Sequence, residues 1–161
     1  MMLLFTAPQR GAREAHHFLS VTKQGLSAIV ATRGNPNCHV ILRGGKDGPN
    51  HDAYNVSRAV ELLRQTKLQP NVMVDCSHAN SGKDPAVQLV VADSVARQVE
   101  AGSRSIIGVM LESFLVAGRQ EPADRDLLTF GQSVTDACLG WEDTLPILEH
   151  LARAALRRRA K

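Results

Sequence analysis

The chain has few aromatic residues and few cysteines, and both shortages narrow the range of functions. One Trp and one Tyr among 161 residues offer little ring surface for stacking on the bases of single-stranded nucleic acid. The three cysteines, Cys38, Cys76 and Cys138, are too few and too scattered for a disulfide framework, and no two form a C-x-x-C pair. These shortages argue against a disulfide-rich secreted domain and against a single-strand-binding module.

Long apolar runs and a strong charge of one sign are also lacking. The opening MMLLFTAP has a short apolar patch with no basic region before it, too short for a signal peptide or a membrane span. The net charge of +3 and the basic end at residues 157–161 could favour an anionic partner, but cations at the end of a last helix also complement its dipole. We expect a single cytoplasmic domain that binds neither nucleic acid nor membrane.

A regular alternation of apolar runs and helical patterns is present instead. Apolar runs of strand length cover residues 17–21, 38–42, 71–76 and 105–111. Helical patterns follow the last three runs, at about residues 52–66, 84–101 and 134–159. The runs are nearly continuous, which is typical of parallel strands buried on both faces. This order predicts an α/β fold with right-handed crossovers.

One segment departs from this alternation. Gly25 can turn the chain after the first run, and residues 26–31 can form a second strand. A loop with turn-forming residues then follows at Gly34, Pro36 and Asn37. The sequence therefore predicts a β-hairpin where a helix would be expected.

Metal-binding types of side chain follow three stretches that a parallel α/β fold would gather at one edge of its sheet. His78 and Glu112 come just after apolar runs, and Asp136 is expected to open the last helix. This nitrogen and oxygen donor set suits Mn, Fe, Co or Zn, and a bound metal could polarise a carbonyl. Each residue also has a simpler explanation, as a structural histidine, a paired or solvated carboxylate, and a helix-capping aspartate.

A cationic turn follows the run at residues 38–42. It consists of Arg43, Gly44, Gly45 and Lys46. The guanidinium fork can bind a phosphate or carboxylate in bidentate fashion, and the glycines allow a ligand to approach the backbone. A surface turn with two solvated cations would have the same sequence, so both interpretations stay open at this point.

Several longer strings narrow these interpretations. They are FLSVTKQGLSAIV, GNPNCHVILRGGKDGPN, VMVDCSHANSGKDP, IIGVMLESFLVAG and SVTDACLGWEDT. Together they resemble the carboxyl-terminal half of class I 3-deoxy-D-arabino-heptulosonate 7-phosphate (DAHP) synthase, the type of bacteria and fungi that responds to aromatic amino acids. The resemblance runs from about residue 18 to residue 159, in order and without a large gap.

The resemblance implies a fold and a reaction. The family folds as a (β/α)8 TIM barrel, of which this chain would form about strands five to eight, with the β-hairpin inserted. The family condenses phosphoenolpyruvate with D-erythrose 4-phosphate to DAHP and phosphate, the first step of the shikimate pathway towards chorismate and the aromatic amino acids. The enol carbon attacks the aldehyde while the metal polarises the aldehyde oxygen. Water then adds at the phosphate-bearing carbon, and phosphate leaves.

The resemblance also assigns roles to single residues. His78, Glu112 and Asp136 match the family's divalent-metal ligands. Arg43 matches an arginine that binds phosphoenolpyruvate, and His78 also lies next to that substrate in the family. Asp136 is a further candidate for substrate contact, and Lys46 is a candidate helper in anion binding.

The predicted hairpin has a family counterpart that helps to bind a feedback-inhibiting aromatic amino acid. Phe18, Ser20 and Val30 fall on matching positions. The ordinary alternative is that Phe18 and Val30 simply pack the hairpin on the barrel. The other wall of that pocket belongs to the amino-terminal half of the family, so the sequence does not identify an inhibitor.

The same comparison implies an incomplete barrel. The family's fourth metal ligand is a cysteine in the amino-terminal half, where most of the substrate-binding cations also lie. Cys76 is a weak candidate to replace that ligand. Residues 1–15 stay unassigned, and residues 16–161 would be the carboxyl-terminal half.

A full barrel runs to about 250 residues, so this chain is too short to form one. Four of the eight strands would leave two unpaired edges and an apolar inner face open to water. We expect the chain to be inactive alone and to pair with a missing amino-terminal half or with further copies of itself. The alternative is a non-catalytic remnant or interaction module that pairs with an intact synthase subunit.

Overall fold

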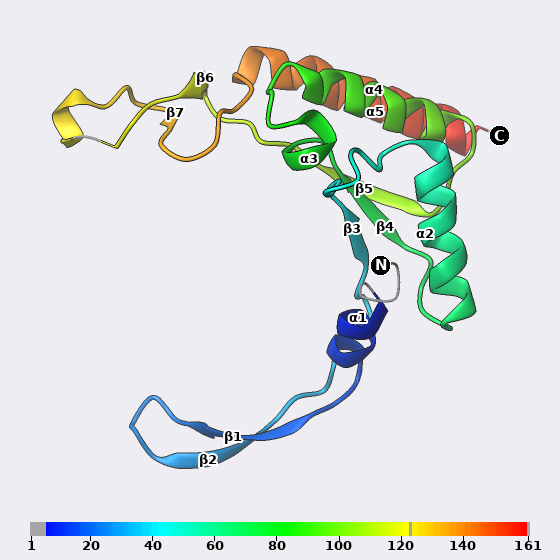
Figure 1. Ribbon diagram of the computed structural model, residues 1–161, viewed down its shortest axis with the longest axis vertical. Coiled ribbons are helices and arrows are strands. Elements are labelled where there is room, and N and C mark those ends of the chain that lie inside the picture. The colour runs from blue at the N-terminus through cyan, green and yellow to red at the C-terminus, as the bar shows by residue number, and fades with distance from the viewer. Residues whose placement is uncertain (1–5, 123, 161) are drawn as a thin grey trace.

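The computed structural model of the chain describes residues 6–122 and 124–160. An α/β core lies at the centre of an open arc, and one arm extends from each end of it (Figure 1). The first arm is an antiparallel hairpin of β1 (His17–Val21) and β2 (Ser27–Ala31). The second arm pairs β6 (Val116–Arg119) with β7 (Gln132–Ser133) and includes the 3-10 turn η2 (Arg125–Leu127). The predicted hairpin is confirmed.

The core sheet has three parallel strands in the order β3 (Val40–Leu42), β4 (Val72–Asp75) and β5 (Ile106–Met110). This arrangement confirms the α/β class. The described residues supply three strands to this sheet instead of the expected four. The run at residues 17–21 pairs with β2 instead, and the chain before the last helix pairs with β6.

Three helices cover one face of the sheet (Figure 1). They are α2 (Ala53–Gln65), α4 (Val87–Glu100) and α5 (Trp141–Arg159). Two short helices, α1 (Thr6–Arg13) and α3 (His78–Ser81), lie outside this layer. Asp52 caps α2 by accepting hydrogen bonds from the backbone N–H groups of Tyr54 and Asn55. The first two predicted sheet-covering helices are confirmed to within three residues at each end.

The third predicted helix begins seven residues later than its pattern suggested, at Trp141. Residues 134–140 form a loop, because bridges from Leu139 to Ser113 and from Cys138 to Gly118 hold this segment extended. The prediction that Asp136 opens a helix was therefore wrong. Long-range backbone pairing outweighs the local capping signal of Ser133 and Asp136.

The hydrophobic core lies between the sheet and these helices. Val72 and Val74 of β4 are fully buried, as are Leu63 of α2 and Val95 of α4. The residues between these positions point to the other face, which is partly open, as the 38% exposure of Ile41 in β3 shows. The predicted burial of both faces is therefore wrong for this chain, whereas the expected open apolar face is confirmed.

No helix within the described ranges has both the length and the apolar character that crossing a bilayer requires.

We predict unequal effects of truncation on the two faces of the sheet. Val74→Ala should lower the free energy of unfolding by about 2 kcal/mol, because it empties a buried site. Ile41→Ala, on the other face, should cost less, because more than a third of this side chain is already exposed to water. Urea unfolding followed by circular dichroism measures both values. Equal losses would mean that another surface covers the open face in solution.

Candidate metal centre

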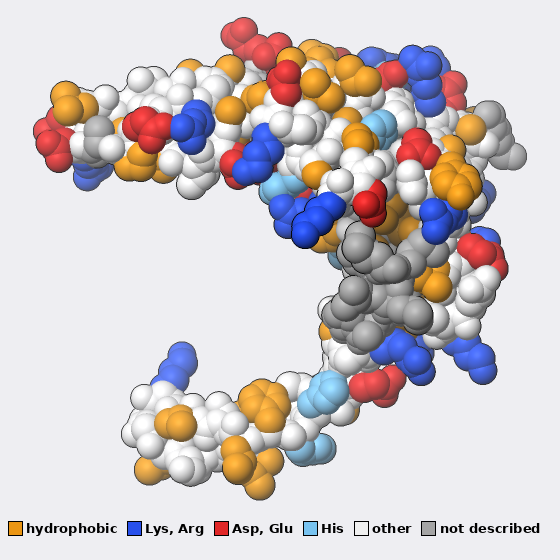
Figure 2. All heavy atoms as spheres, in the orientation of Figure 1, with side chains coloured by type: hydrophobic (Ala, Val, Ile, Leu, Met, Phe, Trp, Pro, Cys, Tyr) orange, Lys and Arg blue, Asp and Glu red, His pale blue; other side chains and the backbone are white. Residues whose placement is uncertain are grey.

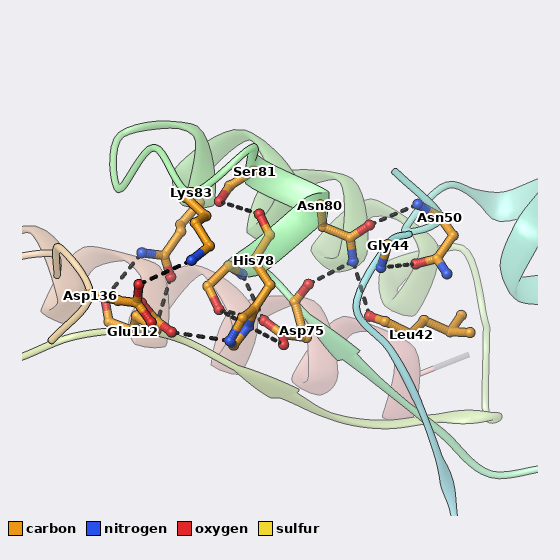
Figure 3. A network of polar contacts seen from close by, with 12 residues as sticks. Leu42, Gly44, Asn50, Asp75, His78, Asn80, Ser81, Lys83, Glu112 and Asp136 are labelled. Atoms are coloured by element: carbon orange, nitrogen blue, oxygen red, sulfur yellow. Dashed lines mark hydrogen bonds and ion pairs between the residues drawn. The ribbon is translucent and has the colours of Figure 1, made fainter. Parts of the chain in front are cut away.

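The start of α3 and two loops at the carboxyl edge of the sheet bring His78, Glu112 and Asp136 together (Figure 3). One ligand atom from each residue lies within 4.8 Å of the others, and the three residues are of intermediate burial. His78 Nε2 lies 3.3 Å from Glu112 Oε1. The three candidate ligands that are far apart in sequence thus converge, as the strand-end pattern predicted.

The His78 ring is held by the end of β4. Its Nδ1 lies 2.6 Å from Asp75 Oδ2. The other oxygen of Asp75 accepts from the backbone N–H of Ser77 at 2.8 Å and from its hydroxyl at 2.6 Å. With Nδ1 engaged in this way, the Nε2 side of the ring faces Glu112 (Figure 3).

The backbone of His78 is strained. Its φ is +48°, in the left-handed region that residues with a Cβ avoid. Such strain costs about 1–3 kcal/mol and is found mainly at functional sites, where the surroundings hold the conformation. Here the His78 carbonyl accepts from the Lys83 N–H at 2.8 Å, closing the turn that directs the ring toward Glu112.

Glu112 is positioned through its backbone by the buried Gln88 of α4. The Gln88 amide donates to the Glu112 carbonyl at 3.0 Å, and its oxygen accepts from the Glu112 N–H at 2.9 Å. The same carbonyl also accepts from Leu139 N–H at 2.9 Å. These bonds tie the loop after β5 both to α4 and to the segment that carries Asp136.

The charges at the centre favour a cation. Partial burial is the main cause that raises the pKa of Glu112, and the nearby Asp136 carboxylate raises it further. The charges on His78 and Lys83 act in the opposite direction without cancelling the rise. Lys83 Nζ lies 3.4 Å from Asp136 Oδ1, but both side chains are well exposed, so this pair offers little compensation. A divalent ion between the carboxylates would relieve their repulsion.

A buried asparagine joins the ends of β3 and β4. The Asn80 amide donates to the backbone carbonyls of Leu42 (3.0 Å) and Asp75 (2.7 Å). Its oxygen accepts from the Asn50 N–H at 2.7 Å. Asn50 in turn accepts from the Gly44 N–H at 2.8 Å, which completes the network in Figure 3.

This network places the predicted cationic turn against α3. Gly44 has φ +75°, and a Cβ there would lie 2.7 Å from the backbone carbon of Ala79, so the close approach requires glycine. Arg43 and Lys46 flank this contact with exposed side chains. They are therefore accessible to an anion at the same edge of the sheet as His78.

Cys76 does not join the cluster of possible metal ligands found among the described residues. It is fully buried in the hydrophobic core, and burial together with the Asp75 charge raises the pKa of its thiol to about 12. Its place in the core, and not its protonation, keeps Cys76 out of the candidate ligand set.

The candidate inhibitor residues share one face of the hairpin. Phe18 lies opposite Val30 in the register, and Ser20 follows two residues along β1. Phe18 is 49% exposed and Val30 is 37% exposed, so neither is buried against the described part of the chain. Figure 2 shows further apolar side chains exposed along this arm.

The chain is similar to known proteins over most of its length. The sequence model described as the DAHP synthetase I family matches residues 6–149. The chain belongs to this family. The matched range includes α1, which the sequence pattern had left unassigned.

Curated relatives of this DAHP synthetase I family chain are named as aldolases. A phospho-2-dehydro-3-deoxyheptonate aldolase of Haemophilus influenzae is 52% identical over 150 residues, which are 92% of this chain and 41% of the relative. The Phe-sensitive enzyme of Escherichia coli is 51% identical and is likewise covered to 41%. The chain thus spans about two fifths of the length of these relatives.

A solved structure supports the arrangement of the elements. The phospho-2-dehydro-3-deoxyheptonate aldolase of Francisella tularensis matches 98% of this chain with a TM-score of 0.91 at 44% identity. The match covers 46% of that chain. The core, the hairpin and the second arm therefore have counterparts in a family structure.

Three positioning residues of this family chain were missed by sequence reasoning. Asp75 stands at a strand end three residues before His78, a spacing that could have indicated a carboxylate and histidine pair. Asn80 and Gln88 gave no such signal, because their partners are backbone groups of distant segments.

Replacing His78 separates backbone strain from side-chain function. We expect His78→Gly to be more stable than His78→Ala by about 1 kcal/mol, because glycine adopts a positive φ without steric cost. Urea unfolding of the two variants gives this difference directly. At the neighbouring Ala79, where φ is not positive, glycine should instead destabilise by about 1 kcal/mol. Equal stability of the two His78 variants would contradict a strained backbone.

Proposed function

We propose that the chain supplies the metal centre and part of the anion site of a DAHP synthase, which condenses phosphoenolpyruvate with D-erythrose 4-phosphate. The observation that carries this proposal is the convergence of His78, Glu112 and Asp136 at one edge of the sheet. The aldolase names of relatives at about 50% identity support it.

The donor set fits a divalent metal. One imidazole and two carboxylates suit Mn, Fe, Co or Zn. Burial raises the pKa of Glu112, and the nearby Asp136 carboxylate raises it further. A bound ion would supply Lewis-acid polarisation of a carbonyl oxygen. The chain itself orients the ligands, through Asp75 at the ring of His78 and Gln88 at the backbone of Glu112.

The cationic turn would hold the carboxylate and phosphate of phosphoenolpyruvate. Arg43 offers a planar fork of donors and Lys46 a second positive charge, both accessible to an anion. His78 and Asp136 would border the same substrate from the metal side. The hydrogen-bond network through Asn80 and Gly44 connects the cationic turn to the segment that carries His78.

The three core strands would be part of a (β/α)8 barrel, completed by the amino-terminal portion of the longer relatives. The open face at Ile41 would then become the barrel interior. An exposed apolar stripe on α5, called the α5 stripe, would receive a helix of that portion; it consists of Trp141, Leu145, Leu148 and Leu156. The helical period puts this stripe on another flank of α5 than His150 and Arg157, which bind α4.

The second candidate function is a non-catalytic interaction module that pairs with an intact synthase subunit. A ligand cluster of three described residues without a cysteine favours this alternative. The cytoplasmic location stays a prediction in either case.

The hairpin face with Phe18, Ser20 and Val30 would form one wall of a site for an aromatic amino acid. The names of two relatives, one Phe-sensitive and one tyrosine-inhibited, support regulation of this kind. Exposed apolar side chains on this face provide the surface that an aromatic ring would contact.

The metal site is testable in the chain alone. Titration with Co²⁺, followed by visible absorption, should give a saturable signal that His78→Ala, Glu112→Ala and Asp136→Ala each weaken by at least about tenfold. Asp93→Ala is the matched control, because this carboxylate also contacts a histidine but lies on α4. A signal that the control reduces as much as the three variants do would contradict the assignment.

Activity should require a second polypeptide. We expect no phosphate release from the two substrates by this chain alone. Mixing it with the amino-terminal portion of the Haemophilus influenzae relative, with Mn²⁺ present, should produce release that His78→Ala abolishes. An inactive mixture would favour the non-catalytic alternative.

Two variants test the proposed contact between the α5 stripe and the added amino-terminal portion. Leu148→Glu places a charge in the α5 stripe and should weaken binding of the added portion at least about tenfold. Val90→Glu, at an exposed position of α4, should leave binding unchanged. Titration calorimetry of the two pieces measures both, and equal effects would rule out the α5 stripe as the contact.

A further inference from the structure

We propose that Asp75 is a positioning residue that fixes the tautomer and orientation of His78, so that Nε2 is the nitrogen that faces the metal. This inference rests on the proposed metal centre, but its geometry stands in the chain alone. The Asp75 carboxylate lies 2.6 Å from Nδ1, and Glu112 lies 3.3 Å from Nε2.

Counting hydrogens decides the direction of the bonds around Nδ1. The Ser77 hydroxyl has one hydrogen, and its oxygen lies 2.6 Å from Asp75 Oδ1, which can accept but not donate when ionised. Ser77 Oγ also lies 2.8 Å from His78 Nδ1. Because the hydroxyl hydrogen is already used, both neighbours of Nδ1 are acceptors. Nδ1 must therefore carry the hydrogen, and the lone pair of the neutral ring is on Nε2.

The carboxylate is itself fixed in place. Asp75 is almost fully buried at the end of β4, where it pairs with Met110 of β5. Its backbone carbonyl accepts from the Asn80 amide at 2.7 Å. Strand pairing and this amide leave the side chain little freedom. Asp75 can thus orient the ring before any metal arrives, which is how outer-shell carboxylates act on metal-binding histidines.

A purely structural role for Asp75 predicts something different. The carboxylate accepts the Ser77 N–H at 2.8 Å, a bond that stabilises the turn whichever nitrogen of His78 holds the hydrogen. In that case removing the charge would lower stability but would not change the tautomer. The tautomer of His78 therefore separates the two roles.

Asp75→Asn in the 161-residue chain tests the inference. Ser77 would still donate to the amide oxygen, so the NH₂ group would face Nδ1 and favour the opposite tautomer, with hydrogen on Nε2. Long-range ¹H–¹⁵N spectra of histidine-labelled protein, at a pH where the ring is neutral, report which nitrogen is protonated. His78→Gln assigns the signal.

We expect Nδ1–H in the unaltered chain and Nε2–H in Asp75→Asn, together with a Co²⁺ affinity that falls about 10- to 100-fold. Ser77→Ala is the matched control, because it removes the hydroxyl but keeps the carboxylate. It should retain the Nδ1–H tautomer and Co²⁺ binding within a few fold.

An unaltered chain with Nε2–H would overturn the inference, as would an Asp75→Asn chain with unchanged tautomer and Co²⁺ affinity. If Asp75→Asn does not fold, as judged by circular dichroism, the tautomer of the unaltered chain and of Ser77→Ala decides alone. Failure of the unaltered chain to bind Co²⁺ would defeat the proposed metal centre but not the tautomer assignment, so the two failures are distinguishable.

Discussion

The arrangement of the centre depends on hydrogen bonds from buried side-chain amides to loop backbones at the carboxyl edge of the sheet. Parallel strands bring their ends to one edge, but the loops beyond them have no regular pairing of their own. Asn80 connects the ends of β3 and β4, and Gln88 holds the backbone of Glu112 to α4. Because these amides are buried with their partners, losing one would leave unsatisfied polar groups as well as a displaced ligand.

The same chain leaves a large apolar surface in contact with water. Helices bury one face of the sheet, whereas Ile41 on the other face, the α5 stripe and the hairpin remain exposed. Such surfaces are characteristic of contacts between protein segments. The family relatives named above are more than twice as long, and the additional length of such proteins is the partner that we propose for this surface. The converging side chains and the exposed apolar surface are thus both consistent with the proposed function.

Much of this was predictable from sequence, because apolar runs and helical periods report burial directly. The hairpin, the three core strands and the convergence of His78 with Glu112 follow from such local patterns. The predicted start of α5 was wrong, because bridges from Ser113 and Gly118 to the segment before the helix override the capping signal near Asp136. The prediction of a fourth strand in the core sheet was wrong for the same reason. The run at residues 17–21 pairs with β2, and such partners are set by tertiary contacts. Gln88 was missed because its partner is a backbone with no sequence signature.

X-ray absorption at the cobalt edge of the Co²⁺-loaded chain identifies the atoms that bind the ion. We expect a first shell of nitrogen and oxygen at about 2.0–2.2 Å, as these donors give with ions of this size, including an imidazole contribution that disappears in His78→Ala. A sulfur shell at about 2.3 Å would mean that a cysteine binds the metal. That result, or a spectrum unchanged by His78→Ala, would contradict a centre built from His78, Glu112 and Asp136.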